Sequence, residues 1–403
     1  MKNYTWGTIV PLIGGLSVAG KQVTGKDPDF FLSYTPFAFN EKNVKDNFPN
    51  VPHHCLDEEN YGGFDYNKKV DFISAVCPCA GLSMLSTGKP EQRAGVNKWL
   101  IESANFITGK LKPKVFWGEN APGLYTNMGK EIRDELRSIA AKNGYTFSVY
   151  FTNTIYHGIP QFRRRTFYFF WQGDKIPIFN YYRRPFKNLK DYLAEVPDGV
   201  SGQTAEDKAA MKAKLDALPG FMFLQDKYKG EGIKMFRDHP IAGTRLQLTV
   251  LQYLIATKQL EEFRDWCLSK NMEGAYKYAK RLCDKIAADE GIWDGTPLKF
   301  KSDGYFSALI SKTAEAVHPT EDRFITTREC MHLMGLPHDY ELTTGALNHV
   351  FQNVPVCTGA DMYREVIGFI EGERELMSAG FAMQSNQAQK VDQVESNLNL
   401  LEF

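Results

Sequence analysis

A cysteine directly after a buried strand is the first residue in this sequence that could do chemistry. Cys79 lies in CPCAGLS, behind the apolar run VDFISAV, and Pro78 stiffens the turn that would present its thiol. Ligands of open α/β sheets bind at the carboxyl ends of the strands, where this spacing places the thiol. A thiolate is a strong nucleophile and can leave again afterwards. We therefore take Cys79 as the candidate nucleophile.

The cysteines of this segment also allow two simpler interpretations. An isolated cysteine is more often a buried structural thiol, and we expect this for Cys77 at the apolar strand end. A zinc site built from Cys77, Cys79 and the cluster His53-His54-Cys55 would match no closed four-ligand spacing, so we expect no metal.

A carboxylate follows the next expected strand. KVFWGENAPGL ends in Glu119-Asn120, about one helix and one strand after Cys79. That distance is one βαβ step, so the side chains of Glu119 and Cys79 could face one crevice. Taken alone, a glutamate in this position is more often a solvated loop carboxylate.

Three polar side chains alternate in GIPQFRRRTFYFF. Gln161, Arg163 and Arg165 stand at every second position where an aromatic strand begins, so we expect them on one face of that strand. A charged run usually marks a solvated face. Here the neighbouring aromatic residues favour partial burial and a fixed partner, such as a carboxylate or the polar edge of a base.

The elements that must position these residues alternate between strands and helices. Helical spacing is expected over 96–111 and 128–145, with Gly144 as a C-cap of the second helix. The alternation indicates an α/β fold with a doubly wound, mostly parallel sheet. Strands or strand ends are expected in WGTIVPLIGG, FFLSYTPFAFNE, VDFISAVCP, KPKVFWGENAP, TFSVYFTNTI and TFYFFW.

The pattern changes near residue 173, which indicates a second domain. Turn-rich aromatic sequence (IPIFNYYRRPF) precedes a largely helical stretch from Thr244 to Gly291. A compact segment over 323–340 and a helix near 359–376 follow. We expect a catalytic domain from 1–172 plus 320–376, with a smaller, helix-rich domain inserted at 173–319. The polar residues 377–403 are expected to form a loosely held tail.

Composition excludes little. The 403 residues have a formal net charge of +0, so any nucleic-acid surface must be local and balanced elsewhere. The seven cysteines are odd in number and mostly lie in apolar runs, which indicates reduced thiols and a cytoplasmic protein. The N-terminus lacks the pattern of a signal peptide, and no apolar run approaches the ~20 residues of a membrane span.

The order of the motifs resembles that of the cytosine-5 DNA methyltransferases, a family of doubly wound enzymes. The resemblance rests first on PC-x-G-x-S, E-N-x-P-G and G-I-P-Q-x-R-x-R. VPLIGGLSVAG, FAFNEKN, HCLDE, RFITTRECMHLMGLP and FQNVPV resemble further family segments in the family's order. The match covers about 1–172 and 320–375. This resemblance implies the fold of class I methyltransferases that use S-adenosylmethionine.

The resemblance also implies a role for each site residue. Cys79 would add to C6 of a cytosine, and Glu119 would share a proton with N3. Arg165 would hold the O2 side of the base, and Arg163 would lie near the thiolate. Asn120 and Gln161 complete the implied catalytic set. The cofactor would contact the backbone and side chains of Ile13, Gly14, Gly15, Glu41, Asp57, Pro78, Leu100, Asn353 and Val354.

The implied reaction uses S-adenosylmethionine and releases S-adenosylhomocysteine. Its partner would be double-stranded DNA, with no membrane involved, and we expect a monomer in the cytoplasm of a prokaryotic or phage-infected cell. The target base must be swung out of the stack, which costs a few kcal/mol. Sequence selection would belong to 173–319. YYRRPFK mixes cations and aromatics as phosphate contacts do, although it could equally be a strand that leads into a hinge.

Several positions depart from the family pattern. Val10 and Leu12 replace a Phe and a Gly of the cofactor loop, Ala80 replaces a Gln, and Gln352 replaces a Gly. A β-carbon at Leu12 would crowd the methionine end of the cofactor unless the backbone differs. Three alternatives therefore stay open: a tRNA cytosine methyltransferase, a DNA-binding homologue with impaired catalysis, and an enzyme that uses another one-carbon donor.

Overall fold

The structure is a computed structural model of the chain. It describes residues 2–57, 63–77, 82, 90–240, 248–290, 298–299, 304–309, 316–342 and 347–386. The chain divides into two compact units, which are treated separately here. The first comprises Met1–Ile159, Arg163–Phe186 and Met334–Val391, and the second comprises Pro160–Phe162, Lys187–Leu333 and Asp392–Phe403.

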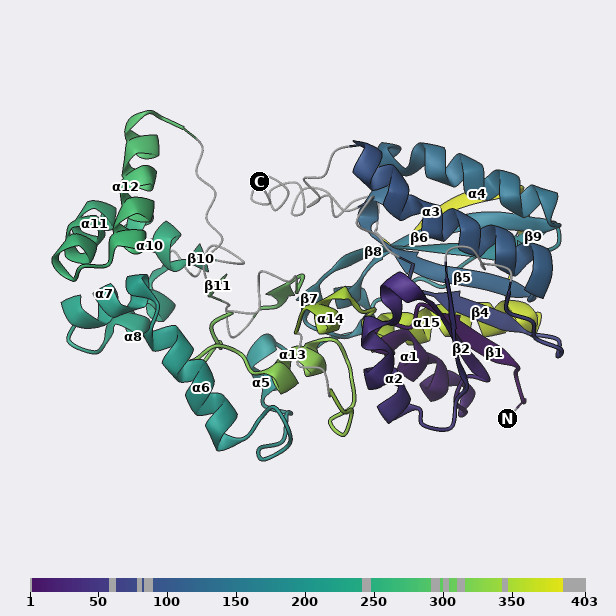
Figure 1. Cartoon of the computed structure of the whole chain (residues 1–403), viewed down its shortest axis with the longest axis horizontal. Helices are drawn as coiled ribbons and strands as arrows, with labels where there is room; N and C mark the ends of the chain where they lie inside the picture. The colour runs from purple at the N-terminus through teal and green to yellow at the C-terminus, as the bar shows by residue number, and fades with distance from the viewer. Residues whose placement is uncertain are drawn as a thin grey trace. The chain divides into compact units, whose positions relative to one another are not determined.

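A mixed sheet forms the centre of the first unit (Figure 1). Its eight described strands run in the order β14-β6-β8-β5-β4-β1-β2-β3. Neighbouring strands are parallel except β8, which is antiparallel to both β5 and β6. The strands are β1 (Trp6–Ile9), β2 (Phe30–Tyr34), β3 (His53–Leu56), β4 (Phe72–Ala75), β5 (Val115–Asn120), β6 (Tyr145–Asn153), β8 (Arg164–Gln172) and β14 (Phe381–Ser385).

Helices cover both faces of this sheet (Figure 1). One face carries α3 (Pro90–Phe106), which continues as a π turn over Ile107–Leu111, and α4 (Lys130–Lys142). The other carries α1 (Gly15–Thr24) and α15 (Val356–Ile370), which pack against each other. The short α2 (Glu41–Asn47) follows β2. The helices expected over 96–111 and 128–145 are therefore present, and Gly144 adopts a left-handed φ of 79° just after α4.

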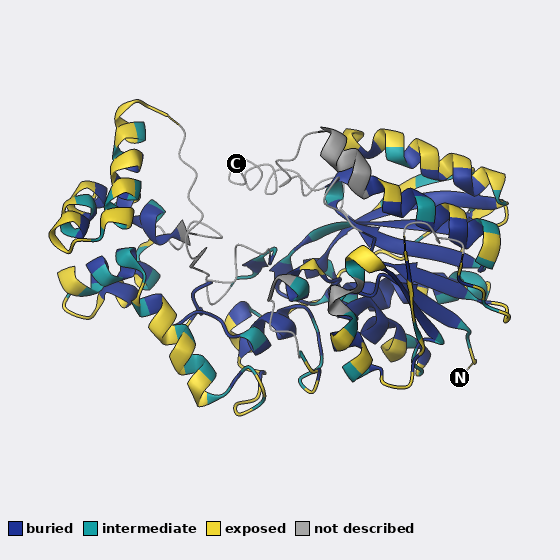
Figure 2. Ribbon diagram, in the orientation of Figure 1, coloured by how far each residue is buried: buried dark blue, intermediate teal, exposed yellow. Residues whose placement is uncertain are grey.

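Alternation along β5 shows how this core is built. Phe116 belongs to the cluster that includes residues of α3 and α4, whereas Trp117 packs edge-on against Tyr363 of α15, with ring centroids 4.7 Å apart. Successive side chains of a strand point to opposite faces, so a strand covered on both sides must be apolar throughout. The sheet is accordingly buried, and exposed residues lie on the outer sides of the helices (Figure 2).

Two expectations for the first unit are wrong. FFLSYTPFAFNE does not stay extended, because β2 ends at Tyr34 and Thr35–Asn40 form a 3₁₀ helix. Residues 377–386 do not belong to a loose tail. β14 pairs in parallel with β6, and β13 (Leu376–Ser378) pairs with β9 (Lys175–Pro177). Short edge strands with partly polar sequence carry little periodic signal, so their pairing partners decide the structure.

The C-terminal strand is fixed by hydrogen bonds at its end. Asn386 is fully buried, and its side chain accepts from the N–H of Tyr182 (2.7 Å) and donates to the carbonyl of Tyr182 (2.8 Å). Residues 387–403 lie outside the described part of the chain. The last helix also ends earlier than expected, at Ile370.

The second unit is mainly helical in its described residues, as the sequence indicates. Its core includes Phe221, Phe236, Tyr253, Phe263 and Leu282. Two short strand pairs accompany the helices: β7 (Gln161–Phe162) with β12 (Phe306–Ser307), and β10 (Leu248–Thr249) with β11 (Leu298–Lys299). The helices are α5 (Leu189–Leu193), α6 (Ala205–Asp216), α7 (Pro219–Lys227), α8 (Gly232–Asp238), α10 (Val250–Ala256), α11 (Leu260–Ser269), α12 (Glu273–Ala287) and α13 (Thr327–Leu333).

Candidate active site

A buried carboxylate stands at the carboxyl end of β5. Glu119 is the penultimate residue of this strand and is 2% exposed. The neighbouring strand β8 is antiparallel, with Glu119 opposite Phe167 and Asn120 opposite Thr166. Arg165 is the next residue of β8 beyond this register. Its Nε lies 2.5 Å from Oε1 of Glu119, which makes an ion pair without the alignment of a good hydrogen bond.

The surroundings of Glu119 favour its protonated form. Burial raises the pKa of this carboxyl above its usual value, and the positive charges of Arg165 and Arg163 only partly oppose the effect. A carboxylic acid with a raised pKa can hold a proton near neutral pH and donate it to a substrate. Glu119 is therefore a buried carboxyl group with a raised pKa rather than a solvated loop residue.

Asn120 presents an amide group without a partner. Its Oδ1 accepts from the N–H of Ala121 (2.9 Å), but its buried Nδ2 has no hydrogen-bond partner within the described part of the chain. Buried polar groups are almost always paired, so this donor needs a partner from outside the described residues.

The segment that contains the candidate nucleophile is described only at its two ends. Pro78 and Cys79 lie outside the described residues. On one side, Cys77 is buried and accepts a hydrogen bond from the Tyr168 hydroxyl at 3.8 Å. On the other, the carbonyl of Leu82 packs against Gly123, where a β-carbon would come within 2.2 Å of it. Both ends of the segment are thus attached to residues of β8 and of the turn after β5.

Cys77 is a structural thiol, as expected. It is 1% exposed, and burial raises its pKa to about 11, so it carries almost no thiolate near neutral pH. The Tyr168 hydroxyl contact lowers that pKa only in part.

Gln161, Arg163 and Arg165 do not lie on one continuous strand, contrary to the expectation. The strand is interrupted at Arg163, between β7 and β8. Gln161 bonds within the second unit, to the Leu333 carbonyl (2.6 Å) and the Leu309 N–H (3.2 Å). The chain passes from one unit to the other at this point, so the alternation of a single strand does not hold. Within the described part of the chain, Arg165 forms an ion pair with the Glu119 carboxylate, and the charge of Arg163 also acts on it.

The side chain of Arg163 binds backbone carbonyls next to the predicted cofactor loop. Its Nη2 donates to the carbonyls of Phe351 (2.6 Å) and Asn353 (3.1 Å). The Oδ1 of Asn353 in turn accepts from the N–H of Gly15 at 3.2 Å. Arg163 therefore fixes the turn that contacts the glycines.

The glycine pair is required by these close contacts. Gly14 has a φ of 91°, and a β-carbon on Gly15 would lie 2.3 Å from Nδ2 of Asn353 and 2.8 Å from the carbonyl of Val354. The structure thus brings together Gly14, Gly15, Asn353 and Val354. The side-chain Nδ2 of Asn353 is buried and has no partner in the described residues. A glycine cradle with an unpaired donor fits a bound polar cofactor.

The other predicted cofactor residues lie on separate elements. Ile13 and Leu100 are fully buried. Asp57 directly follows β3 and is exposed. Glu41 does not stand at a strand end as expected, because the 3₁₀ helix intervenes. It begins α2, and its carboxylate pairs with Lys45 at 2.8 Å.

The segment RFITTREC has a structural role that sequence reasoning missed. Thr326 and Glu329 form a capping box at the start of α13: the Thr326 N–H donates to the Glu329 carboxylate (2.8 Å), and the Glu329 N–H donates to the Thr326 hydroxyl (3.2 Å). Arg323 binds the same carboxylate with both Nη atoms, at 2.9 and 2.7 Å. The spacing T-x-x-E before an apolar run is the signal that predicts such a cap.

Arg133 is a second residue that sequence reasoning missed. It lies on α4, is 8% exposed, and donates to the carbonyls of Leu124 (2.5 Å) and Thr126 (2.6 Å). These bonds fix the turn that follows Glu119 and Asn120. An arginine on the apolar stripe of an amphipathic helix, three residues before the buried Leu136, is an unusual pattern that marks such a buried contact.

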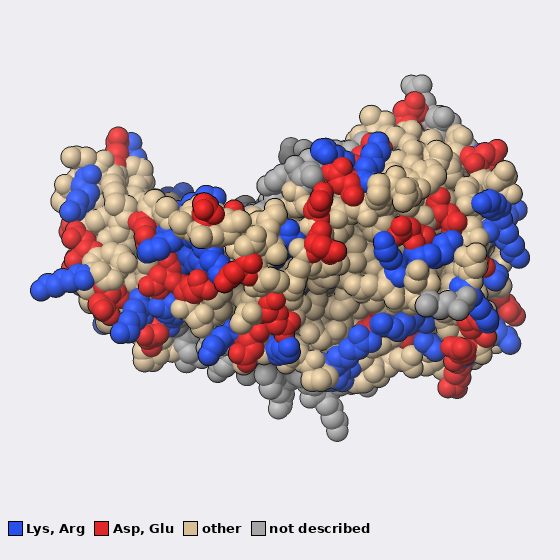
Figure 3. Space-filling view, turned by 90° about the horizontal axis from the view of Figure 1, so that it is seen from below, with Lys and Arg blue, Asp and Glu red and all other residues tan. Residues whose placement is uncertain are grey.

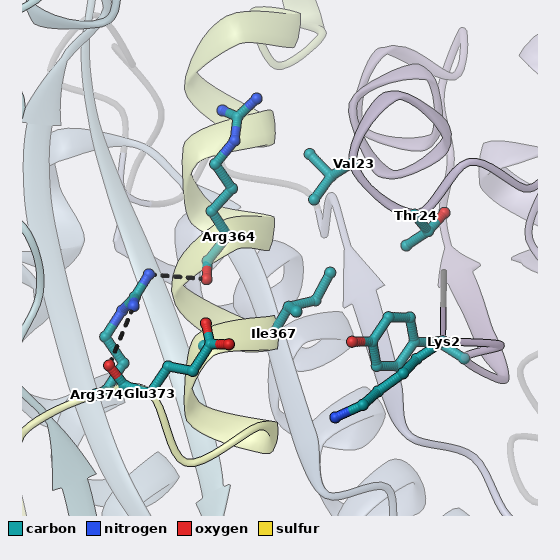
Figure 4. Close-up of a pocket in the computed structure, with 9 residues that line it drawn as sticks. Lys2, Val23, Thr24, Arg364, Ile367, Glu373 and Arg374 are labelled. Carbon is teal, nitrogen blue, oxygen red and sulfur yellow. Dashed lines mark hydrogen bonds between the residues drawn. The ribbon is translucent and has the colours of Figure 1, made fainter.

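A cavity of about 360 Å³ lies elsewhere in the first unit (Figure 4). Val23 and Thr24 end α1, and Ile367 and Gly368 lie near the end of α15, so this cavity is at the amino-terminal edge of the sheet. Its three cations pair with carboxylates of the protein: Lys2 with Glu371, Arg364 with Asp361, and Arg374 with Glu365. Ligands of doubly wound sheets bind at the opposite edge, so the cavity is separate from the candidate active site.

Comparison with solved structures defines the class. The chain superposes on a candidate DNA modification methyltransferase from an E. coli prophage with a TM-score of 0.56 at 15% identity, covering 92% of this chain and 100% of that one. The Entamoeba histolytica methyltransferase EhMeth gives 0.53 at 12%, with 92% and 99% covered, and S. pombe Dnmt2 gives 0.53 at 12%, with 91% and 99% covered. The fold is that of class I methyltransferases, as expected.

The chain belongs to the C-5 cytosine-specific DNA methylase family, whose model matches residues 35–354. It is also similar to DNA (cytosine-5)-methyltransferase 4 of Arabidopsis thaliana, with 22% identity over 340 residues. That match includes 74% of this chain and only 22% of the plant protein, so the chain spans about a fifth of that relative's length. Among the described helices, none combines the length and apolar character that crossing a membrane requires.

Proposed function

We propose that this protein is a DNA cytosine-5 methyltransferase that uses S-adenosylmethionine and forms a covalent bond through Cys79. The observation that carries the proposal is the buried Glu119, with its raised pKa, at the carboxyl end of β5 beside Arg165 and the unpaired amide of Asn120. Family membership supports the reaction class. The contacts of Cys77 and Leu82 support a position for Cys79 near this group.

Each residue of the site would contribute one part of the chemistry. The thiolate of Cys79 adds to C6 of cytosine, and the electron density that moves onto the ring is stabilised by a proton or hydrogen bond from Glu119 at N3. This makes C5 nucleophilic. Once C5 has been methylated, a water molecule would take the C5 proton, the C5–C6 double bond would form again and the Cys79 thiolate would be expelled. Arg165, which is 16% exposed, contacts the O2 side of the base, and Asn120 donates its unpaired amide.

S-adenosylmethionine would supply an electrophilic methyl group on a sulfonium. The chain would hold it with the glycine pair Gly14-Gly15, the Asn353 amide and the backbone at Val354, which the structure brings together. Asp57 would contact the adenine, and Glu41 would contact the ribose after leaving its ion pair with Lys45. The replacement of a family glycine by Leu12 does not remove the cradle, because Leu12 keeps a left-handed φ of 53°.

Double-stranded DNA is the proposed partner. Residues 173–319 would recognise its sequence, and the protein would act in the cytoplasm. Charge alone does not mark this surface. On the face displayed in Figure 3, cations and acids are interspersed. On α12, Lys277 pairs with Glu273 (2.6 Å) and Lys280 pairs with Asp284 (2.7 Å), so its lysines are partly neutralised. On a surface of mixed charge, DNA would have to be recognised through specific contacts rather than through net charge.

Sequencing of DNA tests the proposal. Bisulfite or nanopore reads of DNA from cells that express the protein should show C5 methylation at one recurring sequence, and the Cys79→Ala variant should show none. Nucleoside mass spectrometry of tRNA and DNA from the same cells should find the new 5-methylcytosine in DNA. Modification confined to tRNA, a product other than 5-methylcytosine, or no modification with intact DNA binding would contradict the proposal.

A further inference from the structure

The turn after β1 has a backbone conformation that its side chains disfavour. Val10 and Leu12 have φ values of 49° and 53°, in the left-handed region, and Gly14 follows at 91°. A β-branched or bulky residue in this region is an outlier, and such conformations persist only where the surrounding structure enforces them. The turn leads directly into the glycine pair of the proposed cofactor site.

Tyr340 holds this turn from a distant part of the sequence. Its hydroxyl donates to the carbonyl of Ile13, between the strained Leu12 and Gly14. The side chain is 4% exposed, and a β-carbon on Gly14 would lie 2.8 Å from the hydroxyl oxygen. The phenol group thus lies against the turn and binds the Ile13 carbonyl directly.

The turn that carries Tyr340 is itself attached to α2. Asn47 at the end of this helix accepts from the N–H of Glu341 (2.9 Å) and donates to the carbonyl of Glu341 (2.8 Å). The Tyr340 N–H closes the turn on the carbonyl of Pro337 at 3.1 Å. Two paired bonds therefore fix the backbone next to Tyr340, so its hydroxyl has a defined direction.

We propose that Tyr340 is a positioning residue that holds residues 10–15 in the strained conformation needed to receive S-adenosylmethionine, and that it compensates for leucine at position 12. The inference rests on the proposed function. Glycine would adopt the left-handed conformation without strain, so a chain with Leu12 depends on an external contact. The Tyr340 hydroxyl provides that contact on the adjoining peptide.

Calorimetric titration of S-adenosylhomocysteine tests this dependence without turnover. Tyr340→Phe removes one hydrogen bond, which is worth about 1 kcal/mol, so the affinity should fall about fivefold. In activity assays the KM for the methyl donor should rise while kcat at saturation stays the same. In a Leu12→Gly background, the loss caused by Tyr340→Phe should be clearly smaller.

Tyr145→Phe is the matched control. Tyr145 is also 4% exposed and donates its hydroxyl to a backbone carbonyl, that of Pro113, at 2.6 Å. The control substitution should lower the urea midpoint about as much as Tyr340→Phe does, with no change in affinity. Asn47→Ala does not alter residues 10–15 and should also weaken the binding of S-adenosylhomocysteine. It replaces Tyr340→Phe as the test variant if Tyr340→Phe does not fold.

Wild-type affinity in Tyr340→Phe, or in Asn47→Ala if the tyrosine variant does not fold, would overturn the inference. So would an equal loss of affinity whether Tyr340→Phe is introduced into the wild type or into Leu12→Gly. If the unaltered protein itself fails to bind S-adenosylhomocysteine, the proposed function fails instead, so the two failures are distinguishable.

Discussion

Nε of Arg165 lies 2.5 Å from a carboxylate oxygen of Glu119 at the place where β8 and β5 meet. Glu119 is 2% exposed and the Arg165 side chain is 16% exposed, so the guanidinium is the more accessible partner of the pair. This pair places one acidic and one basic side chain in contact at the candidate site. Burial raises the pKa of the acid, and the guanidinium limits that rise. The pKa of Glu119 therefore depends on the balance between its burial and the charge of Arg165.

The pH profile of kcat/KM should report this balance. Glu119 acts in its protonated form, so activity should fall as pH rises through its pKa, which lies above the usual value. Arg165→Gln removes the nearest cation that lowers this pKa, and the falling limb should move to higher pH. Arg165→Lys keeps the charge, and its limb should stay close to that of the wild type. A limb that moves to lower pH in Arg165→Gln would contradict the assignment.

Folding stability should follow the same group with a definite sign. Because the folded-state pKa of Glu119 is raised, its contribution to the free energy of unfolding is complete below the unfolded-state pKa and is lost as pH rises through the folded-state value. Glu119→Gln cannot ionise. Urea unfolding at several pH values should therefore show the wild type losing stability relative to Glu119→Gln as pH rises. A constant difference would show that Glu119 does not titrate in this range.

The C-terminal strand should be required for stability. Asn386→Ala removes two hydrogen bonds to the backbone of Tyr182 at a fully buried position and should cost about 2 kcal/mol. Gln384 makes the same pattern, accepting from Phe179 (3.1 Å) and donating to Pro177 (3.0 Å), but it is partly exposed. Gln384→Ala should cost clearly less in urea unfolding. Equal small costs would indicate that β14 is not held through Asn386.

An exposed arginine that lies over two tyrosine rings should contact DNA. The guanidinium of Arg183 lies over the rings of Tyr156 (4.9 Å) and Tyr181 (5.5 Å), and Tyr181 is 54% exposed. A lost phosphate contact should lower the slope of log affinity against log salt by about 0.9. Arg183→Gln should do this, whereas Arg137→Gln, which removes an arginine stacked on Phe381 at 4.6 Å, should not. Identical slopes for all three proteins would refute the contact.

The sequence predicts where the strands of the sheet lie better than it predicts what individual side chains contact. Periodicity and motif order locate the strands that carry Glu119 and Arg165, because buried parallel strands have continuous apolar sequence. They fail for Gln161, since the strand is broken where the chain changes units. They fail also for β14, whose partner β6 is more than 200 residues away in the sequence. Local pattern contains no information on such distant pairings.

The contacts of some site residues could be found only from the structure. Arg163 is predicted from its motif, yet two hydrogen bonds of its guanidinium go to the backbone carbonyls of Phe351 and Asn353, which no spacing rule predicts. The departure at Leu12 is visible in the sequence, but its consequence is not. Leu12 lies in the left-handed region, where glycine would be unstrained and leucine is not.

Covalent capture of the target base tests the central claim most directly. Once sequencing has identified the target, a duplex with 5-fluorocytosine at that position should trap the protein, because fluorine cannot leave as a proton does and the thiol is not expelled. Denaturing gels and intact mass spectrometry should show a protein–DNA adduct for the wild type and for Cys77→Ala, whose thiol is buried. Cys79→Ala should give no adduct. An adduct that persists in Cys79→Ala would contradict the account.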